Sequence, residues 1–255
     1  MWPSVSTDIF MRFSEQFEGA VDYMFLDNKN RVGTAYGIDL DWNGNGESPS
    51  VDVARRDGLE RKALQLRWVY RDTNNTATPA DVRKDWETVK SMPGHYFPFY
   101  KAYTKLQLPK DAMIAGVTAS LRSNEWVLKQ NSAFRNFDKW PADAQLAVMG
   151  LSWNGPGWLL GNGPNATLPN PTAFRAACEA EDFGEAASHC QMTNAIRGDN
   201  NSIYRRSQAQ MHLLLNADII VREEARGSYQ RSLLYWPTWL DRHLIATPPH
   251  PHFIR

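Results

Sequence analysis

Cysteine is scarce in this sequence, and net charge is absent. The two cysteines, Cys178 and Cys190, are twelve positions apart, which fits neither zinc-ligand spacing nor a redox CxxC motif and leaves a single disulfide open. The 28 basic and 28 acidic side chains cancel. Because binding through phosphates depends on excess positive charge, we expect no nucleic-acid partner held mainly in that way.

Long apolar runs are also missing. No stretch approaches the roughly 20 uninterrupted apolar residues of a membrane-spanning helix, and the first residues lack the basic-then-apolar order of a secretory signal. We therefore expect no membrane insertion, and synthesis in the cytoplasm without a signal peptide. With 255 residues, 42% of them hydrophobic, the chain can bury a sizeable core.

Apolar residues recur mainly at helical spacing, and strand signals occur only between residues 23 and 40. Turn chemistry at residues 27–30 (DNKN) separates two predicted strands there. The predicted fold is therefore α+β, mostly helical with one small sheet. The spacing predicts a first helix that ends near residue 19. It predicts further helices over residues 53–70, 79–92, 110–128, 141–153, 174–177, 183–190 and 208–224, of which 141–153 is expected to be the best buried.

Two carboxylates flank the start of the predicted sheet. Glu18 lies at a predicted helix end, and Asp27 lies in the hairpin turn nine positions later. Glycoside hydrolysis needs one carboxyl group that protonates the leaving oxygen and a second, ionised one that places a water or stabilises the oxocarbenium-like transition state. A helix beside a hairpin can aim both groups into one cleft.

The residues around this pair form a recognisable pattern. Glu18 and Gly19 are followed by Tyr23–Asp27 (YMFLD) and then by Val32–Gly37 (VGTAYG). This order resembles the active-site segment of phage T4-type lysozymes, glycoside hydrolase family 24, in which a helix ending in Glu-Gly precedes an Asp-bearing hairpin and a Thr-x-Gly-x-Gly strand. It is most similar to the lysozyme-like muramidases of phage lysins and type VI secretion effectors, and looser similarity extends over most of residues 10–222.

The resemblance implies a lysozyme-like catalytic domain over residues 1–226, with a small β lobe at about 20–52 beside a larger helical lobe, and a C-terminal extension over 227–255. It implies a muramidase that hydrolyses the β-1,4 bond between N-acetylmuramic acid and N-acetylglucosamine in bacterial peptidoglycan. Glu18 would be the general acid and Asp27 the second carboxylate. The enzyme would act on the cell wall after lysis or delivery, with a delivery or immunity protein as a further partner.

The predicted strand departs from the family pattern. The position of the family's catalytic threonine is Gly33, with Thr34 one step later, and Ala35 replaces the next glycine. A one-residue shift turns a strand side chain to the opposite face. A catalytic Thr34 therefore requires a bulge in the hairpin; the alternatives are a differently positioned water or reduced activity.

The segment after the hairpin carries a second signal. Asp41, Asn43, Asn45, Gly46 and Asp52 match positions 1, 3, 5, 6 and 12 of an EF-hand calcium loop, with Asp in place of the terminal Glu. The four Asp and Asn residues are candidate ligands of a structural calcium ion, and a metal-free Asn-Gly-rich turn is the alternative. The chemistry itself needs no cofactor.

Three aromatic residues are candidates for stacking on sugar rings: Tyr36 in the hairpin strand, and Trp153 and Trp158 beside a glycine-rich loop. Packing in the core is the alternative for each tryptophan. Two rival functions stay open as well. A lytic transglycosylase cleaves the same polymer without water and needs one acid, and a lysozyme-like module without turnover would only bind glycan or a partner protein.

Overall fold

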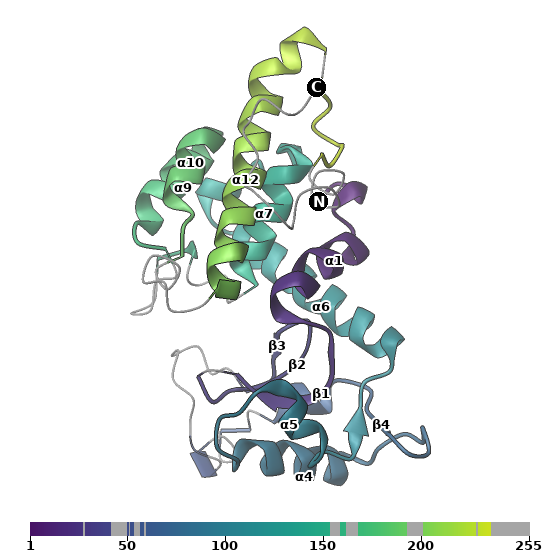
Figure 1. Ribbon diagram of the computed structural model, residues 1–255. Coiled ribbons are helices and arrows are strands. Elements are labelled where there is room, and N and C mark those ends of the chain that lie inside the picture. Colours follow the sequence, from purple (N-terminus) through teal and green to yellow (C-terminus); the bar gives the residue numbers. More distant parts are fainter. Residues whose placement is uncertain are drawn as a thin grey trace. The chain divides into compact units, whose positions relative to one another are not determined.

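A computed structural model describes residues 1–27, 29–41, 50, 52–53, 57–58, 60–153, 159–161, 168–192, 201–227 and 229–235. The chain divides into two compact units (Figure 1). The sheet unit comprises residues 14–120, and the helical unit comprises residues 1–13 and 121–255. The boundaries fall inside two helices, α1 (Thr7–Glu18) and α6 (Lys110–Lys129), so that Glu18 belongs to the sheet unit.

The sheet unit contains two small antiparallel sheets in its described part, one ordered β1-β2-β3 and one formed by β4 and β5. Helices α4 and α5 pack against β1. The elements are β1 (Val21–Leu26), β2 (Val32–Ala35), β3 (Ile38–Asp39), α3 (Arg61–Leu64), β4 (Val69–Tyr70), α4 (Pro79–Lys90), α5 (Phe97–Lys101) and β5 (Leu106–Gln107).

Helix α4 begins where the sequence predicts and ends at Lys90, two residues before the predicted end. The Thr78 hydroxyl accepts a hydrogen bond from the backbone N–H of Asp81 at 3.2 Å, and Pro79 occupies the first helical position, where its missing N–H costs nothing. Its apolar stripe is buried, with Trp86 and Val89 fully enclosed. Helix α4 therefore packs with a buried apolar face beside the hairpin strands β1 and β2.

The predicted helix over residues 53–70 is only partly formed. Among its described residues, Val53 and α3 are helical, whereas Val69 and Tyr70 form a strand paired with Gln107 and Leu106. The helical spacing of apolar residues in 53–70 competed with the strand preference of a β-branched and an aromatic residue. A partner more than 30 positions away decided the outcome, and local periodicity cannot reveal such a partner.

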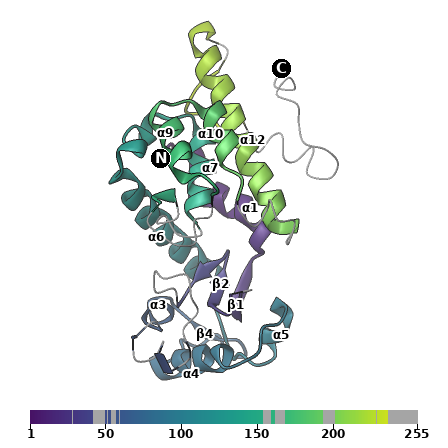
Figure 2. The same ribbon diagram turned by 90° about the vertical axis from the view of Figure 1, so that its left-hand side faces the viewer.

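The helical unit is built around α7 (Ala142–Ser152), all of whose residues are buried. The prediction that this segment is the best-buried helix is confirmed: every side chain of α7 is buried, including those of its three polar residues, Asp143, Gln145 and Ser152. Helix α12 (Asn201–Glu223) lies beside it, and α10 (Phe183–His189) packs on both α12 and α9 (Pro171–Glu179) (Figures 1 and 2). Short 3-10 turns cover Pro3–Val5, Ser132–Phe134, Phe137–Lys139 and Glu224–Arg226.

Part of the predicted C-terminal extension packs on the helical unit. The backbone N–H of Tyr235 donates to the buried Asp143 carboxylate at 3.0 Å, and the carbonyl of Arg231 accepts from the N–H of Ala142 at 2.7 Å. Both contacts meet the first turn of α7, where backbone N–H groups lack helical partners. Residues 229–235 therefore belong to the structure of this unit.

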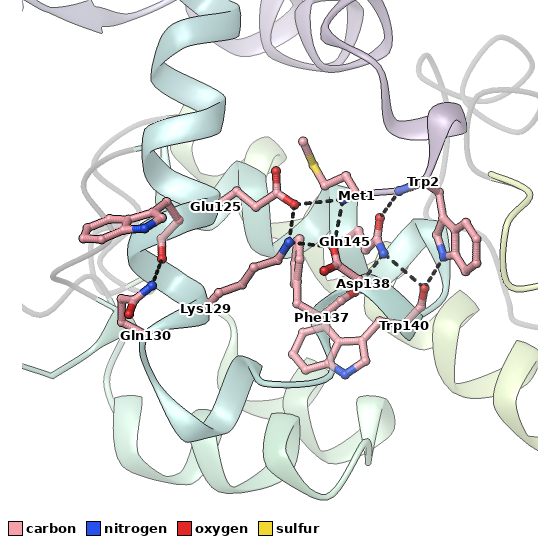
Figure 3. Close-up of polar contacts among 10 residues, drawn as sticks. Met1, Trp2, Glu125, Lys129, Gln130, Phe137, Asp138, Trp140 and Gln145 are labelled. Atoms are coloured by element: carbon pink, nitrogen blue, oxygen red, sulfur yellow. Dashed lines mark hydrogen bonds and ion pairs between the residues drawn. The ribbon is translucent and has the colours of Figure 1, made fainter.

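The first residue is held by a charged cluster on the helical unit (Figure 3). The Met1 ammonium contacts Glu125 at 2.8 Å and Asp138 at 3.0 Å, and the Lys129 ammonium lies 2.7 Å from each of the same two carboxylates. Burial by itself would raise the pKa of Glu125, but hydrogen bonds from Lys129 and the Met1 ammonium outweigh it and lower that pKa.

The predicted fold class is confirmed: the structure is α+β and mostly helical, with small antiparallel sheets. Cys178 and Cys190 are buried free thiols, so the disulfide that the sequence left open is not formed in this structure. Burial raises the pKa of both thiols. Among the described residues, no helix combines the length and apolarity that a membrane crossing requires.

Candidate active site

Glu18 occupies the last position of α1, where its half-buried side chain points at the turn between β2 and β3. Gly19 follows in the left-handed conformation, at φ +71, which ends the helix as glycine commonly does. A Cβ atom placed on Gly37 would lie 3.3 Å from the carboxyl carbon of Glu18. The carboxyl group therefore rests on the backbone of this turn, in space that only glycine leaves open.

The turn under Glu18 interrupts the strand that the sequence predicts over residues 31–40. Ala35 and Gly37 both have positive φ, +52 and +86, so β2 ends at Ala35 and the short β3 returns beside it. The register pairs Gly33 with Asp39 and Thr34 with Ile38. A non-glycine residue in the left-handed region is strained. Ala35 is such a residue, at a position where the T4-type lysozyme pattern has glycine.

Asp27 lies at the tip of the β1–β2 hairpin, and hydrogen bonds occupy both of its oxygens. Oδ1 accepts from the backbone N–H groups of Lys29 and Arg31, both at 2.8 Å. Oδ2 accepts from Nε and Nη2 of Arg31, at 2.8 and 2.6 Å. The first pair is the pattern of an Asx turn, and the second is a strong charge-assisted contact. Together they fix the direction of the carboxylate.

A series of charged contacts leads from Arg31 to the buried Asp41. Nη1 of Arg31 lies 2.8 Å from Asp39, which accepts from the N–H of Asp41 at 3.1 Å. The buried Asp41 accepts from the N–H of Val32 at 3.0 Å and from the ammonium of Lys90 on α4 at 2.5 Å. Burial raises the pKa of Asp41 to about 6, although Lys90 opposes the shift. This charge network ties the hairpin to α4.

Thr34 is fully buried, and its hydroxyl donates to the carbonyl of Val21 at 3.4 Å. The register of β1 against β2 does shift between Val21 and Phe25, so the hairpin has an irregularity of the kind that a catalytic Thr34 requires. The irregularity leaves Thr34 in the interior of the sheet all the same. In this structure its hydroxyl has no exposed surface with which to place a water.

The two described candidates for sugar binding, Tyr36 and Trp153, are buried. Tyr36 and Trp153 are 7% and 9% exposed, and Trp153 packs on Phe10 in the helical unit with 4.7 Å between ring centroids. Packing, the alternative for Trp153, is what the structure displays. Trp158 lies outside the described residues.

The predicted calcium ligands are only partly described. Asn43 and Asn45 lie outside the described residues, and Asp52 is exposed in a short helical segment. Asp41, the first ligand position, already holds Lys90 and the N–H of Val32 with its two oxygens. Within the described ranges, no cluster of three or more histidine, cysteine or acidic residues is arranged to hold a metal. The calcium site stays a prediction.

The sequence interpretation missed the residues that hold the two carboxylates. Gly37 makes room for Glu18, Arg31 orients Asp27, and Lys90 anchors the hairpin from α4. A basic residue four positions after Asp27 in a turn was a local signal for Arg31. No local signal existed for Lys90, since its partner Asp41 is 49 positions away.

Comparisons of the chain with protein-family models, with curated proteins and with solved structures found no match. What the site does must therefore be inferred from its residues and their chemistry.

Proposed function

We propose that this protein is a peptidoglycan-cleaving glycosidase of the muramidase type, with Glu18 as the general acid. The observation that carries the proposal is the half-buried Glu18 carboxyl at a helix end, set against a glycine turn beside a hairpin that bears Asp27. The resemblance of the surrounding motif to T4-type lysozymes supports the same chemistry.

In the hydrolytic reaction, Glu18 gives its proton to the glycosidic oxygen as the bond between that oxygen and the sugar carbon breaks. The sugar acquires oxocarbenium character, which a fixed carboxylate such as Asp27 stabilises. A water then adds to the sugar carbon and gives its proton to a carboxylate, the role that the two-carboxylate mechanism assigns to Asp27. Arg31 keeps Asp27 in one orientation throughout.

One observation favours a second candidate, a lytic transglycosylase. Four donors already engage Asp27, so its oxygens are poorly available as a base for water. In the waterless reaction, Glu18 protonates the leaving oxygen, and the muramic acid's own 6-hydroxyl attacks the sugar carbon. The hydroxyl proton returns to Glu18, and the product is a 1,6-anhydro ring. This route uses a single acid.

The test is release of soluble muropeptides from purified peptidoglycan by the intact chain and by Glu18→Gln. We expect Glu18→Gln to lower the rate by about 10²- to 10⁴-fold, the usual contribution of a general acid. Glu15→Gln is the matched control, because Glu15 is an exposed carboxylate on the same helix. Mass spectrometry of the products distinguishes the two reactions. Hydrolysis leaves reducing ends, and transglycosylation leaves anhydro ends.

No muropeptide release by a folded wild-type chain would overturn both enzymatic proposals and leave the binding module. Circular dichroism of each variant establishes folding.

We further propose that the protein acts at the cell wall after lysis or delivery, with a delivery or immunity protein as partner. Affinity capture with the intact chain, followed by identification of bound proteins, tests that partnership.

A further inference from the structure

The sheet unit carries a group of exposed aromatic rings that the proposed chemistry does not use. We call His95, Tyr96, Phe97, Phe99 and Tyr103, on and around α5, the aromatic platform. Tyr96 is 66% exposed, Tyr103 50% and Phe97 37%. Exposed large aromatic side chains gathered on one short segment are uncommon on a protein surface and mark binding sites.

The platform rings are ordered against one another and against the sheet. The rings of His95 and Phe99 stack 4.1 Å apart at 14°, and Tyr96 and Tyr103 extend this row at 4.6 and 5.0 Å. Phe97 packs on Phe25 of β1 at 4.4 Å, which joins the platform to the hairpin sheet. Helix α5 lies beside β1 in both views (Figures 1 and 2).

The buried Tyr100 fixes the backbone of the platform segment by hydrogen bonds. The Tyr100 hydroxyl accepts from the backbone N–H of His95 at 2.8 Å and donates to the carbonyl of Pro93 at 3.0 Å. Tyr100 itself has no exposed surface. The segment that presents the rings is therefore fixed before any ligand arrives, which lowers the entropic cost of binding.

The segment that carries the platform is itself basic. Residues 95–110 contain three lysines, at positions 101, 105 and 110, and no acidic residue. The Lys101 ammonium and the Arg71 guanidinium lie 5.6 and 5.8 Å from the centroid of the Tyr23 ring on β1. A ligand of this surface thus meets aromatic faces and nearby cations together.

We propose that the aromatic platform binds the glycan strand of peptidoglycan, as a substrate-holding surface separate from Glu18. The apolar faces of sugar rings would stack on Tyr96 and Tyr103, and carboxylates of the peptide stems would pair with Lys101. Apart from Pro98, no aliphatic side chain larger than alanine occurs between residues 95 and 103, whereas a protein-docking surface usually mixes aliphatic and aromatic groups. The choice of polymer rests on the proposed function.

The test is cosedimentation of the Glu18→Gln chain with insoluble peptidoglycan, since this variant is expected to leave the polymer intact. We expect Tyr96→Ala combined with Tyr103→Ala to weaken binding roughly tenfold, by loss of two ring contacts. Tyr96→Phe combined with Tyr103→Phe keeps the rings and should keep the binding. Trp126→Ala is the matched control, because Trp126 is also 66% exposed but lies in the helical unit.

Equal binding by the alanine and phenylalanine pairs would overturn the inference, as would loss of binding in Trp126→Ala of the same size. Single-stranded DNA is a second probe, because bases also stack on aromatic rings. Platform-dependent binding of DNA without binding of peptidoglycan would overturn the glycan assignment. Platform-dependent glycan binding by a wild-type chain without turnover would sustain this inference while the proposed function fails.

Discussion

At the scale of single residues, the contact between Glu18 and Gly37 carries the most weight for function. Two conditions meet at Gly37, a positive φ that L side chains rarely adopt and a distance of 3.3 Å from an added Cβ to the Glu18 carboxyl carbon. The first condition concerns stability, and the second concerns the position of the acid. Substitutions can separate the two.

We expect Gly37→Ala to lose about 1 kcal/mol or more of unfolding free energy from backbone strain, and most of the muropeptide release from displacement of Glu18. Gly227→Ala is the control, because Gly227 also has positive φ, at +72, but nothing lies within 4 Å of an added Cβ. It should show the strain without the loss of rate. Similar rates for the two variants would contradict a positioning role for Gly37.

Asp27 is the residue that distinguishes the two cleavage mechanisms. Asp27→Asn removes the charge that Arg31 pairs with, and we expect the variant to unfold more easily by about 1.5 to 3 kcal/mol, the range for hydrogen bonds to charged groups. If Asp27 is the second carboxylate, muropeptide release falls in the folded variant at a temperature well below its unfolding midpoint. Release of anhydro products at an undiminished rate would support single-acid cleavage.

At the scale of elements, the buried pair of Lys90 and Asp41 joins α4 to the hairpin. Removing one member of such a pair is costly, because the other charge stays buried without its counterion. The Lys90 side chain is 3% exposed and that of Asp41 0%, so water cannot easily replace the lost partner. The orientation of the hairpin thus depends on a residue far from it in sequence.

We expect Lys90→Met to cost about 3 to 5 kcal/mol near pH 8 and clearly less near pH 5. The reason is the pKa of Asp41, which burial raises to about 6 even with Lys90 present, and which should rise further without the cation. A raised folded-state pKa means that the folded chain holds the proton more tightly, so the stability contribution of Asp41 declines as pH rises. Urea unfolding at both pH values measures the difference.

A pH-independent cost in Lys90→Met would contradict this account of Asp41. Lys84→Met is a suitable control, because Lys84 is an exposed lysine on the same helix. Its cost should be small at both pH values, since surface charges contribute little to stability.

At the scale of the whole molecule, the described C-terminal residues 229–235 are hydrogen-bonded to the helical unit. The described residues 229–235 supply a backbone donor to Asp143 and an acceptor for Ala142 at the start of α7. The carbonyl of Ser232 also accepts from the Ser4 hydroxyl at 2.6 Å, which connects this segment to the first residues of the helical unit.

A chain cut after Gly227 should therefore unfold more easily than one cut after Tyr235. We expect a difference of about 1 to 3 kcal/mol or more in unfolding free energy, because the cut removes the Tyr235 donor from the buried Asp143. Chemical denaturation followed by circular dichroism measures both truncated chains. Equal midpoints would show that these contacts add nothing to stability.

The sequence by itself determined the elements whose signals are local. Helix α4 has its cap at Thr78, α7 is mostly apolar in sequence, and α1 ends at Glu18 before a glycine, so neighbouring residues suffice to predict them. The hairpin turn at Asp27 was predictable for the same reason. Fold class followed from these local patterns.

Only the tertiary structure decided the features that depend on distant partners. The strand at Val69–Tyr70 exists because Leu106–Gln107 pairs with it, and Asp41 serves the charge network because Lys90 reaches it across 49 positions. Thr34 is buried, although its sequence position suggested a place in the active site. Hydrogen bonds, burial and ion pairs between distant segments outweigh local preference wherever the chain folds back on itself.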